Sequence, residues 1–467
     1  MSLQSPWLAE LVRRRPIKRL TQYHETDVVV IGGGIAGTST AAFTLKDTPL
    51  RITLIEAGKI GHGATGRNAG QMLTEFERPL GELVNSYGQE EVRVGLQKVE
   101  TAWDLVKDLQ EDFSLQTPVI HAPGYNGYSG RDPLLEELEN IYWKKELQLP
   151  WHQMRIAKDL FDTSLIPEKY QDLWVEDTHE SILTDLETKD PAYIALCQTR
   201  LACTNSAQLS EELIQALLHR YGNRFFLFEE SPVSELHLER DHIMLKIGAY
   251  QVKAKQVVLC TNGFEQFRVF HFLGKDINAQ VHRDIRGVVS FMQGHTVPVY
   301  KPVKGLDYYT SSMVAPEDDP SASDTFVYLT RRPFHTRDGQ ERGLVCLGGP
   351  ETSLPEEIAY DPEHHIPEFV RDEFDRFLKG SPLGTHADAH HPTFEWHGLM
   401  GYTNGRVRCI GREPCYADLL YNLGCNGIGI MTSIYGGKRI AGLLMDRDDG
   451  ANLFNPKMRN CELPKHP

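Results

Sequence analysis

Three glycines near the N-terminus have a spacing that suits the binding of a pyrophosphate. They are Gly32, Gly34 and Gly37, in the stretch VVVIGGGIAG. Gly32 permits a tight turn out of a strand, Gly34 lets the backbone approach a phosphate, and Gly37 lets a helix pack closely. Glu56, about 20 residues further on, can accept hydrogen bonds from two ribose hydroxyls. The pattern predicts a dinucleotide site and leaves NAD and FAD open.

These residues need a strand, a turn, a helix and a second strand to hold them. The β-branched run DVVVI at 27–31 is typical of a buried parallel strand, and IAGTSTAAFTLKD at 35–47 indicates a helix. RITLIEAG at 51–58 indicates a second buried strand that carries Glu56 at its end. The helix start would offer free N–H groups and a partial positive charge to the phosphates. We therefore expect a βαβ unit in an α/β protein.

A second glycine-rich stretch, GHGATGRNAGQ at 61–71, follows directly after Glu56. Chains that bind NAD usually continue with a helix at this point. A longer cofactor needs a second length of backbone that can lie close to it, and glycines permit that approach. The second stretch therefore favours FAD over NAD.

The stretch resembles the FAD loop of the D-amino-acid-oxidase-like FAD-dependent oxidoreductase superfamily, nearest the γ-glutamylputrescine oxidoreductase and glycine oxidase-like branch. Two further regions carry the resemblance. One is the segment 233–263, which contains PVSEL and ends in VVLCTNG. The other is C-terminal, where EWHGLMGYTNGRVRCIGREP and NLGCNGIGIMTSIYGGKRIAGLL match family motifs in order. Together the matches reach from about residue 25 to 445.

The resemblance implies a glutathione-reductase-type Rossmann FAD-binding domain and a second, antiparallel-sheet substrate domain. We expect the FAD-binding domain to be discontinuous, over 20–115, 176–282 and 394–467, and the substrate domain to cover 116–175 and 283–393. Residues 1–19 are expected to form an N-terminal strap. Outside the βαβ unit, the residue pattern indicates helices within 75–113, at 206–222 with Ser206 as a possible cap, at 367–379 and at 427–446, and antiparallel strands between 281 and 350.

The resemblance also implies which residues contact FAD. In chain order they are Gly32, Gly34, Ile35, Ala36, Gly37, Glu56, Ala57, Gly63, Ala64, Thr65, Arg67, Asn68, Ala69, Gly70, Gln71, Val233, Thr261, Asn262, Gly263, Gly424, Asn426, Gly427, Ile428 and Gly429. The last five lead into a helix whose start would favour the negative charge that reduced flavin gathers at N1 and the C2 carbonyl.

Some members of the superfamily attach FAD covalently, through a cysteine in the C-terminal strand segment or a histidine in the N-terminal loop. The matching positions here lie near Gly398 and Arg67. Neither residue can form such a bond, so we expect non-covalent FAD.

The resemblance implies oxidation of a C–N bond of a small amine or amino acid to an imine, by hydride transfer to flavin N5. No catalytic base is assigned, and the electron acceptor is O2 or unknown. Weak candidates for substrate binding are Arg286, Arg331 and Tyr328, with Arg332, Tyr308 and Tyr309 as further possibilities; salt bridges and core packing are the alternative roles. A flavoprotein that acts on a protein partner as a cofactor-maturation factor is the alternative function, and an NAD-linked dehydrogenase is a third.

Composition and net charge limit the classes of partner that we expect for this chain. The net charge of −15 argues against a nucleic-acid surface, and no apolar run is long enough for a transmembrane helix. The basic run RRRPIKR at 13–19 is expected to be solvated, and we expect no secretory signal. The eight cysteines form no C-x-x-C pair, which favours free thiols and a cytoplasmic setting.

A histidine-rich run, THADAHHPTFEWHG, raises the question of a metal. His386, His390 and His391 have a spacing that could place two side chains on one helix face. No acidic or cysteine partner has a suitable spacing, and Pro392 interrupts the run. We therefore expect a polar loop and no metal site.

Overall fold

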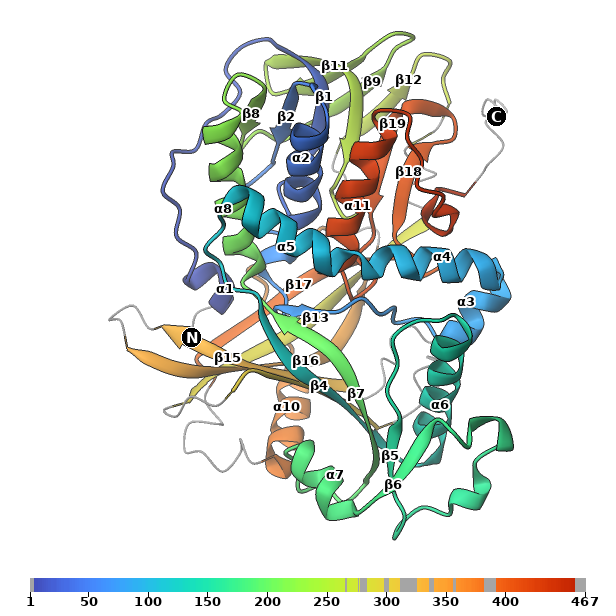
Figure 1. The fold of residues 1–467 in the computed structure, drawn as a ribbon. Helices are drawn as coiled ribbons and strands as arrows, with labels where there is room; N and C mark the ends of the chain where they lie inside the picture. Colours follow the sequence, from blue (N-terminus) through green and yellow to red (C-terminus); the bar gives the residue numbers. More distant parts are fainter. Residues whose placement is uncertain are drawn as a thin grey trace.

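The fold consists of two large β-sheets, with helices packed on both (Figure 1). The computed structural model describes residues 4–264, 267–275, 277, 284–297, 302–310, 326–335, 340–355, 358–381 and 392–457. The nine-stranded first sheet and the ten-stranded second sheet are both assembled from segments far apart in the sequence.

The first sheet has a parallel centre that contains the predicted βαβ unit. Its parallel strands, in spatial order, are β8 (Phe225–Phe228), β2 (Ile52–Ile55), β1 (His24–Ile31), β11 (Tyr250–Leu259) and β19 (Tyr416–Leu423). Four further strands extend it: β10 (Ile243–Ile247), β9 (Glu235–Leu238), β12 (Arg268–His271) and β18 (Cys409–Glu413). The predicted strand at 27–31 is confirmed and is buried, as the apolar run requires.

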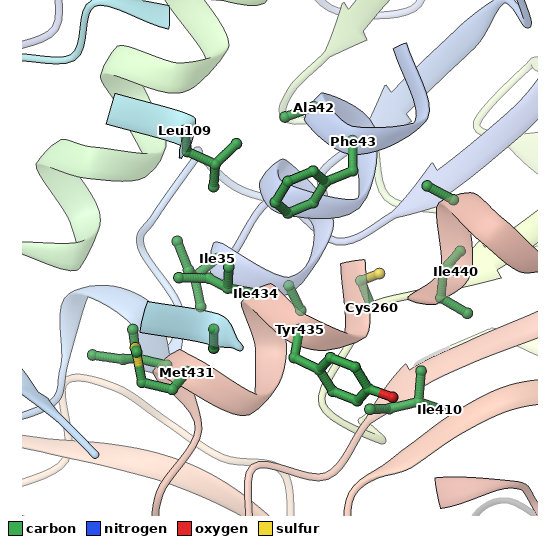
Figure 2. Close-up of a cluster of buried hydrophobic side chains, with 14 of the residues drawn as sticks. Ile35, Ala42, Phe43, Leu109, Cys260, Ile410, Met431, Ile434, Tyr435 and Ile440 are labelled. Carbon is green, nitrogen blue, oxygen red and sulfur yellow. The ribbon is translucent and has the colours of Figure 1, made fainter. Parts of the chain in front are cut away.

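Helix α2 (Ile35–Asp47) follows β1 and is buried along almost its whole length. Helix α11 (Ile430–Leu443) packs directly on it, and a side chain at Gly437 would overlap the backbone of Ser39 and Thr40. Figure 2 shows Ile35 and Phe43 meeting Ile434 and other side chains of α11 in this shared core. The small residues of the sequence pattern thus serve close helix packing, and the predicted helix at 35–47 is confirmed.

The second sheet is mainly antiparallel, as predicted. Its order is β17 (Phe394–Thr403), β13 (Ile285–Val297), β16 (Glu341–Leu354), β15 (Phe326–His335), β14 (Lys304–Tyr309), β4 (Ile120–Ser129), β7 (Tyr193–Cys203), β5 (Met154–Ala157) and β6 (Trp174–Asp177), with β3 (Gln71–Met72) paired to β7. The pairs β14–β4 and β5–β6 are parallel. Strands β3, β7 and β17 belong to this sheet, although the expected boundaries assign their residues to the FAD-binding domain; the boundaries themselves stay a prediction.

The remaining helices cover the sheets (Figure 1). They are α1 (Pro6–Ala9), α3 (Leu80–Tyr87), α4 (Gln89–Glu100), α5 (Ala102–Phe113), α6 (Arg131–Glu146), α7 (His179–Asp185), α8 (Ser206–Arg220) and α10 (Glu368–Gly380). Short 3-10 turns occur at Ala64–Gly66, Thr163–Leu165, Glu168–Tyr170 and Asn452–Phe454. The predicted cap of α8 is wrong by one residue: the Asn205 side chain accepts from the Gln208 N–H, and the Ser206 hydroxyl instead donates to the Thr65 carbonyl.

Two composition-based expectations can be compared with the described residues. No helix in the described ranges is long and apolar enough to cross a membrane. Free thiols are found at Cys197, Cys203, Cys260, Cys346, Cys409 and Cys425. The expectation that every cysteine is free is wrong for Cys415, which is disulfide-bonded.

Candidate functional site

A large internal cavity lies between the two sheets. Its volume is about 940 Å³, and residues at the carboxyl ends of β1, β2 and β11 line it, together with residues of the second sheet. Ligands of open parallel sheets bind at this edge of the strands. The cavity is therefore the candidate site, and the glycine motifs form one end of it.

The first glycine turn has the shape that its residues predict. Gly32 has φ of 110°, in the left-handed region, and its N–H donates to the Ile55 carbonyl at 2.9 Å. A side chain at Gly37 would overlap the Gly32 carbonyl oxygen, so only glycine lets α2 begin here. Gly34 is the N-cap of α2 and brings no side-chain hydrogen bond to the helix start. The turn thus leaves the N-terminus of α2 exposed to the cavity, which is the geometry that binds a pyrophosphate.

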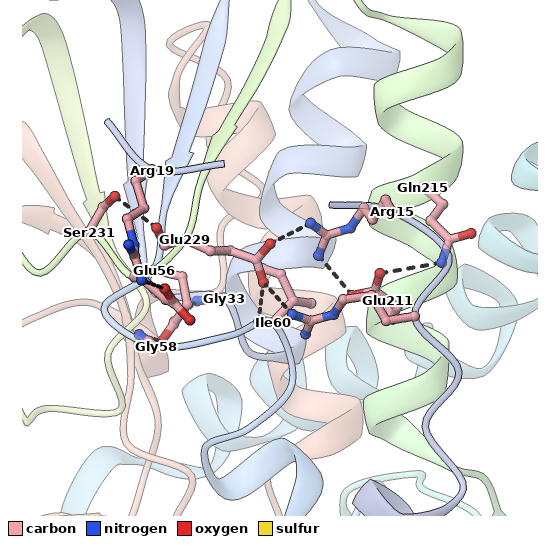
Figure 3. A network of polar contacts seen from close by, with 12 residues as sticks. Arg15, Arg19, Gly33, Glu56, Gly58, Ile60, Glu211, Gln215, Glu229 and Ser231 are labelled. Carbon is pink, nitrogen blue, oxygen red and sulfur yellow. Dashed lines mark hydrogen bonds and ion pairs between the residues drawn. The ribbon is translucent and has the colours of Figure 1, made fainter. Parts of the chain in front are cut away.

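Glu56 lines the cavity beside this turn. Its carboxylate accepts hydrogen bonds from the Gly33 N–H at 2.6 Å and the Gly58 N–H at 2.7 Å (Figure 3). Burial raises the pKa of Glu56, and the two N–H donors partly offset that rise. The Ser231 N–H donates to the Glu56 carbonyl at 3.0 Å, which holds the turn containing Val233 against the same end of the cavity.

The second glycine-rich stretch is connected directly to the first. The Ile35 N–H at the start of α2 donates to the Thr65 hydroxyl oxygen at 2.9 Å. Asn68 fixes the turn itself, because its amide donates to the carbonyls of Ala64 and Thr65 and its Oδ1 accepts from the Gly70 N–H at 2.8 Å. The two stretches therefore form one continuous wall of the cavity.

The N-terminal segment supports this wall from outside. The Trp7 indole N–H donates to the Asn68 carbonyl, and the Ser5 hydroxyl donates to the Gly66 carbonyl. The Trp7 side chain is fully buried, and the Arg332 guanidinium stacks over its ring at 4.1 Å. This contact, and an ion pair with Glu10, occupy the Arg332 that the sequence offers as a substrate ligand.

The expectation that the basic run at 13–19 is solvated is wrong for part of it. Arg13 and Arg15 form ion pairs with Glu211 and Glu229, whose side chains are fully buried (Figure 3). Glu229 also accepts from the Ile60 N–H at 2.9 Å, next to the second glycine-rich stretch. The arginines are needed because buried carboxylates must be paired.

Replacing Trp7 with alanine is expected to lower the free energy of unfolding by about 3 kcal/mol, since a large buried aromatic side chain and its hydrogen bond are lost. The exposed Val12, half accessible to solvent in the same segment, provides the control Val12→Ala. Urea denaturation measures both variants. Equal stability of Trp7→Ala and Val12→Ala would show that the segment does not brace the wall.

The predicted cofactor loops that follow β11 and β19 also border the cavity. The Cys425 N–H donates to Asn262 Oδ1 at 2.8 Å, which joins the ends of β11 and β19. Asn426 Oδ1 accepts from the Thr403 N–H at 2.8 Å, and α11 begins just beyond, with Gly429 as an N-cap that brings no side-chain hydrogen bond. A helix start therefore borders the cavity here as well.

Most of the predicted contacts line the cavity. They are Gly32, Gly34, Ile35, Ala36, Glu56, Ala57, Gly63, Ala64, Thr65, Arg67, Asn68, Ala69, Gln71, Val233, Thr261, Asn262, Gly427, Ile428 and Gly429, together with the substrate candidate Tyr328. Seven predicted residues are absent from the lining: Gly37, Gly70, Gly263, Gly424, Asn426, Arg286 and Arg331. Of these, Gly37 and Gly70 permit close packing, against Gly32 and Trp7, and Asn426 shapes a turn.

The two main arginine candidates for substrate binding do not line the cavity themselves. Arg331 is buried and forms a two-pronged ion pair with Glu187, at 2.6 and 3.0 Å. Arg286 is exposed, with its guanidinium 5.9 Å from the centre of the Tyr402 ring. We therefore do not retain Arg331 as a ligand for a substrate carboxylate.

Arg67 and Gly398 lie together on the cavity wall. A side chain at Gly398 would contact the Arg67 carbonyl and Cβ, and both residues line the cavity. The two positions at which some members of the superfamily attach their flavin are therefore adjacent here, and neither carries a cysteine or a histidine.

Sequence reasoning missed a group of acidic residues that line the cavity beyond the second glycine-rich stretch. Its members are Glu75, Glu77, Glu137, Asp307 and Glu351. Glu75 and Glu77 come soon after the second glycine-rich stretch, and Asp307 lies between the large hydrophobic residues Leu306 and Tyr308. Those two signals could have drawn attention to the group.

The electrostatics of the acidic group are uneven. Lys144 donates to Glu75 at 2.8 Å and holds the pKa of that carboxyl below its ordinary value, despite burial. Burial and the neighbouring Glu75 raise the pKa of Asp307 to about 7. Burial raises the pKa of Glu77, although the Tyr402 hydroxyl donates to it at 2.6 Å. Burial and the neighbouring Glu77 raise the pKa of Glu351.

Within the described ranges, no group of three or more His, Cys, Asp or Glu side chains is arranged to hold a metal ion. The run that contains His386, His390 and His391 lies outside the described residues.

Comparisons with known proteins agree with the geometry of the cavity. Residues 27–443 match the family model described as "DAO: FAD dependent oxidoreductase". A probable oxidoreductase OrdL of Haemophilus influenzae is 24% identical over 58% of this chain and 56% of its own length. Gamma-glutamylputrescine oxidoreductase of Escherichia coli is 33% identical over 19% of this chain and 21% of its own. The chain thus spans about half, or less, of the length of these relatives.

Solved structures share the fold. Glycine oxidase from Geobacillus kaustophilus has a TM-score of 0.62 at 14% identity, covering 91% of this chain and 96% of its own. L-proline dehydrogenase from P. horikoshii has a TM-score of 0.61 at 19% identity, covering 92% and 97%. The glutathione-reductase-type Rossmann fold with a second, antiparallel-sheet domain is thereby confirmed. The glycine wall, the two helix starts and the family match lead to one conclusion: this chain belongs to the DAO family of FAD-dependent oxidoreductases, and its cofactor is FAD.

Proposed function

We propose that this enzyme oxidises a C–N bond of a small amine or amino acid to an imine. The observation that carries the proposal is the continuity of the cavity, from the glycine wall at 32–37 and 61–71 to a polar pocket on the second sheet. An internal pocket of this kind suits a small substrate better than a protein partner. Relatives with names such as gamma-glutamylputrescine oxidoreductase and glycine oxidase support the same substrate class.

The residues that line the cavity suit FAD. The start of α2 would hold the pyrophosphate, Glu56 would hold a ribose, and the turn at Val233 would meet the adenine. We assign the flavin ring to the region between Arg67, Gly398 and the turn at 425–429, where the start of α11 favours negative charge. Three predicted contacts in that region do not line the cavity and would act by shaping its turns: Gly263, Gly424 and Asn426.

The chemistry divides between cofactor and protein. When bound, flavin supplies a two-electron acceptor for a hydride from the substrate carbon next to nitrogen. The chain would orient the amine in the pocket lined by Tyr328, Tyr402 and Glu351. Because the pKa of Glu351 is raised, this carboxyl can hold a proton near neutral pH and exchange it with the amine nitrogen.

FAD is expected to be held without a covalent bond, because neither Arg67 nor Gly398 offers a nucleophile. Precipitation with trichloroacetic acid should leave the yellow colour in the supernatant. Yellow colour that stays with the pellet would contradict the expectation, and the spectrum of a proteolysed pellet would then identify the attached peptide.

We also propose a cytoplasmic location, on the grounds that six of the described cysteines are free thiols. The disulfide at Cys415 is the observation that argues against it.

The proposed reaction is tested with the purified, FAD-loaded enzyme under anaerobic conditions. A panel of alkylamines, secondary amines and amino acids is mixed with the enzyme, and the flavin absorbance is followed. Bleaching by at least one member, with a carbonyl compound and free amine formed in equal amount after hydrolysis, is expected. Bleaching by no member, or only by compounds without nitrogen, would contradict C–N oxidation.

A further inference from the structure

We propose that the far end of the cavity binds a second cationic group of the substrate, so that the preferred substrates are diamines or related amines with a distant ammonium. This inference rests on the proposed C–N oxidation and adds a specificity site to it. The site consists of Asp307 on β14 and Asn126 on β4, which pair in the register of the second sheet.

Each of the two side chains has an oxygen atom that accepts no hydrogen bond. Asp307 and Asn126 are both more than nine-tenths buried and both line the cavity. Oδ1 of Asp307 and Oδ1 of Asn126 have no hydrogen-bond partner among the described residues. A buried acceptor without a partner is costly, so its persistence in a cavity wall indicates a ligand that donates. An ammonium group carries three donors and no acceptor, and it would satisfy both oxygens.

Two neighbouring groups carry donors that make no hydrogen bond of acceptable geometry: the Tyr128 hydroxyl beside Asn126 and the Gln71 amide beside Asp307. The Gln71 amide favours the ionised form of Asp307. It is neutral, so it leaves the charge of the carboxylate uncompensated. Gln71 could orient Asp307 without replacing a cationic partner.

The distribution of charged groups also favours a cationic ligand. The charge of Lys144 is already paired, because its amine lies 2.8 Å from Glu75 and 4.0 Å from Glu137. No salt bridge within the described ranges joins Asp307, or the carboxyls of Glu77 and Glu351, to a lysine or arginine. Arg406 lines the cavity and lies near enough to act on Glu77 and Glu351. No cation of the described residues acts on Asp307 in this way, and a cationic ligand would supply one.

The placement separates two roles along the cavity. Glu351 and Glu77 lie toward the turn at Gly427, where we assign the flavin, because a side chain at Gly427 would overlap the Glu77 carboxylate. Asp307 lies two strands away from β16, beyond Tyr328 in the register of the sheet. The reacting amine would thus lie near Glu351, and the second ammonium near Asp307.

The test compares matched substrates on the FAD-loaded enzyme: 1-aminobutane against 1,4-diaminobutane, then diamines of three, five and six carbons. We expect kcat/KM to favour the best diamine over the monoamine of equal length by about 30-fold, chiefly through KM. In Asp307→Asn that ratio should fall by about the same factor. Glu341→Gln, an exposed carboxylate on β16, is the control and should leave the ratio unchanged.

A ratio near one in the wild-type enzyme, or a ratio that Asp307→Asn leaves unchanged, would overturn the inference. If Asp307→Asn fails to fold, Asn126→Ser provides the same comparison, with a smaller expected fall in the ratio. Bleaching of the flavin by monoamines and diamines alike would sustain the proposed function while overturning the second-cation site.

A binding experiment separates the two failures further. 2,5-Dimethylhexane-2,5-diamine and 2,5-dimethylhexan-2-amine keep primary ammonium groups but have no hydrogen on the carbon next to nitrogen, so they cannot be oxidised to imines. Each is titrated into the enzyme while the flavin spectrum is recorded. Tighter binding of the dication, weakened in Asp307→Asn, would support the cation site even if no amine bleached the flavin. Equal binding of the two probes would count against it.

Discussion

Replacing Gly37 with valine is expected to weaken FAD binding by about 100-fold, which corresponds to about 3 kcal/mol of overpacking at the start of α2. The added side chain would overlap the Gly32 carbonyl oxygen, and that backbone cannot give way without moving the turn. Because the turn and the helix start together form the phosphate site, a small shift misdirects several N–H donors at once.

The measurement is the FAD dissociation constant, obtained by titrating the apoprotein with FAD and following fluorescence quenching. Gly380→Ala is the matched control, since the nearest atom to its added methyl group is 3.9 Å away. FAD affinity of Gly37→Val equal to that of Gly380→Ala would show that this turn does not form the phosphate site.

Replacing Lys144 with methionine is expected to cost about 3–5 kcal/mol of stability, because it leaves buried carboxyls without their cation. Glu75 loses its partner at 2.8 Å, and Glu137 loses the nearby charge. Lys145→Met is the control: it is the next residue, more exposed, and paired with an exposed Asp172.

This cost should depend on pH in a defined direction. In the native protein Lys144 lowers the pKa of Glu75 despite burial, whereas in Lys144→Met burial alone would raise that pKa above its ordinary value of 4.5. A carboxyl whose pKa is raised in the folded state costs stability as the pH rises above 4.5, so the variant should lose stability between pH 5 and pH 8. The stability difference between wild type and Lys144→Met should therefore be larger at pH 8 than at pH 5. Urea denaturation at both pH values measures it; a difference that is constant, or larger at pH 5, would contradict this assignment.

The cofactor end of the cavity could be predicted from the sequence because its requirements are local. Gly32, Gly34 and Gly37 act within one turn, and their spacing directly reflects the backbone geometry that a phosphate needs. The stretch 61–71 is also contiguous. Asn68 illustrates the limit: the sequence places it beside the cofactor, while the structure shows that its amide holds the turn.

The substrate end could not be predicted because it is assembled from distant segments. Asp307 meets Asn126 only through the pairing of β14 with β4, and Glu351 meets Glu77 only because the two sheets enclose one cavity. For the same reason the sequence leaves the role of Arg331 open between substrate ligand and salt bridge: its partner Glu187 comes from another part of the chain. The burial of the N-terminal arginines could not be predicted because their partners, Glu211 and Glu229, lie about 200 residues further along the chain.

The most direct test of C–N oxidation is the rate of anaerobic flavin bleaching by an amine and by the same amine deuterated at the carbon next to nitrogen. Stopped-flow absorbance should show saturable bleaching that is several-fold slower with the deuterated substrate, because that C–H bond breaks as the flavin is reduced. Bleaching at equal rates would contradict hydride transfer from this carbon as the slow step. No bleaching by any amine would contradict the proposed reaction itself.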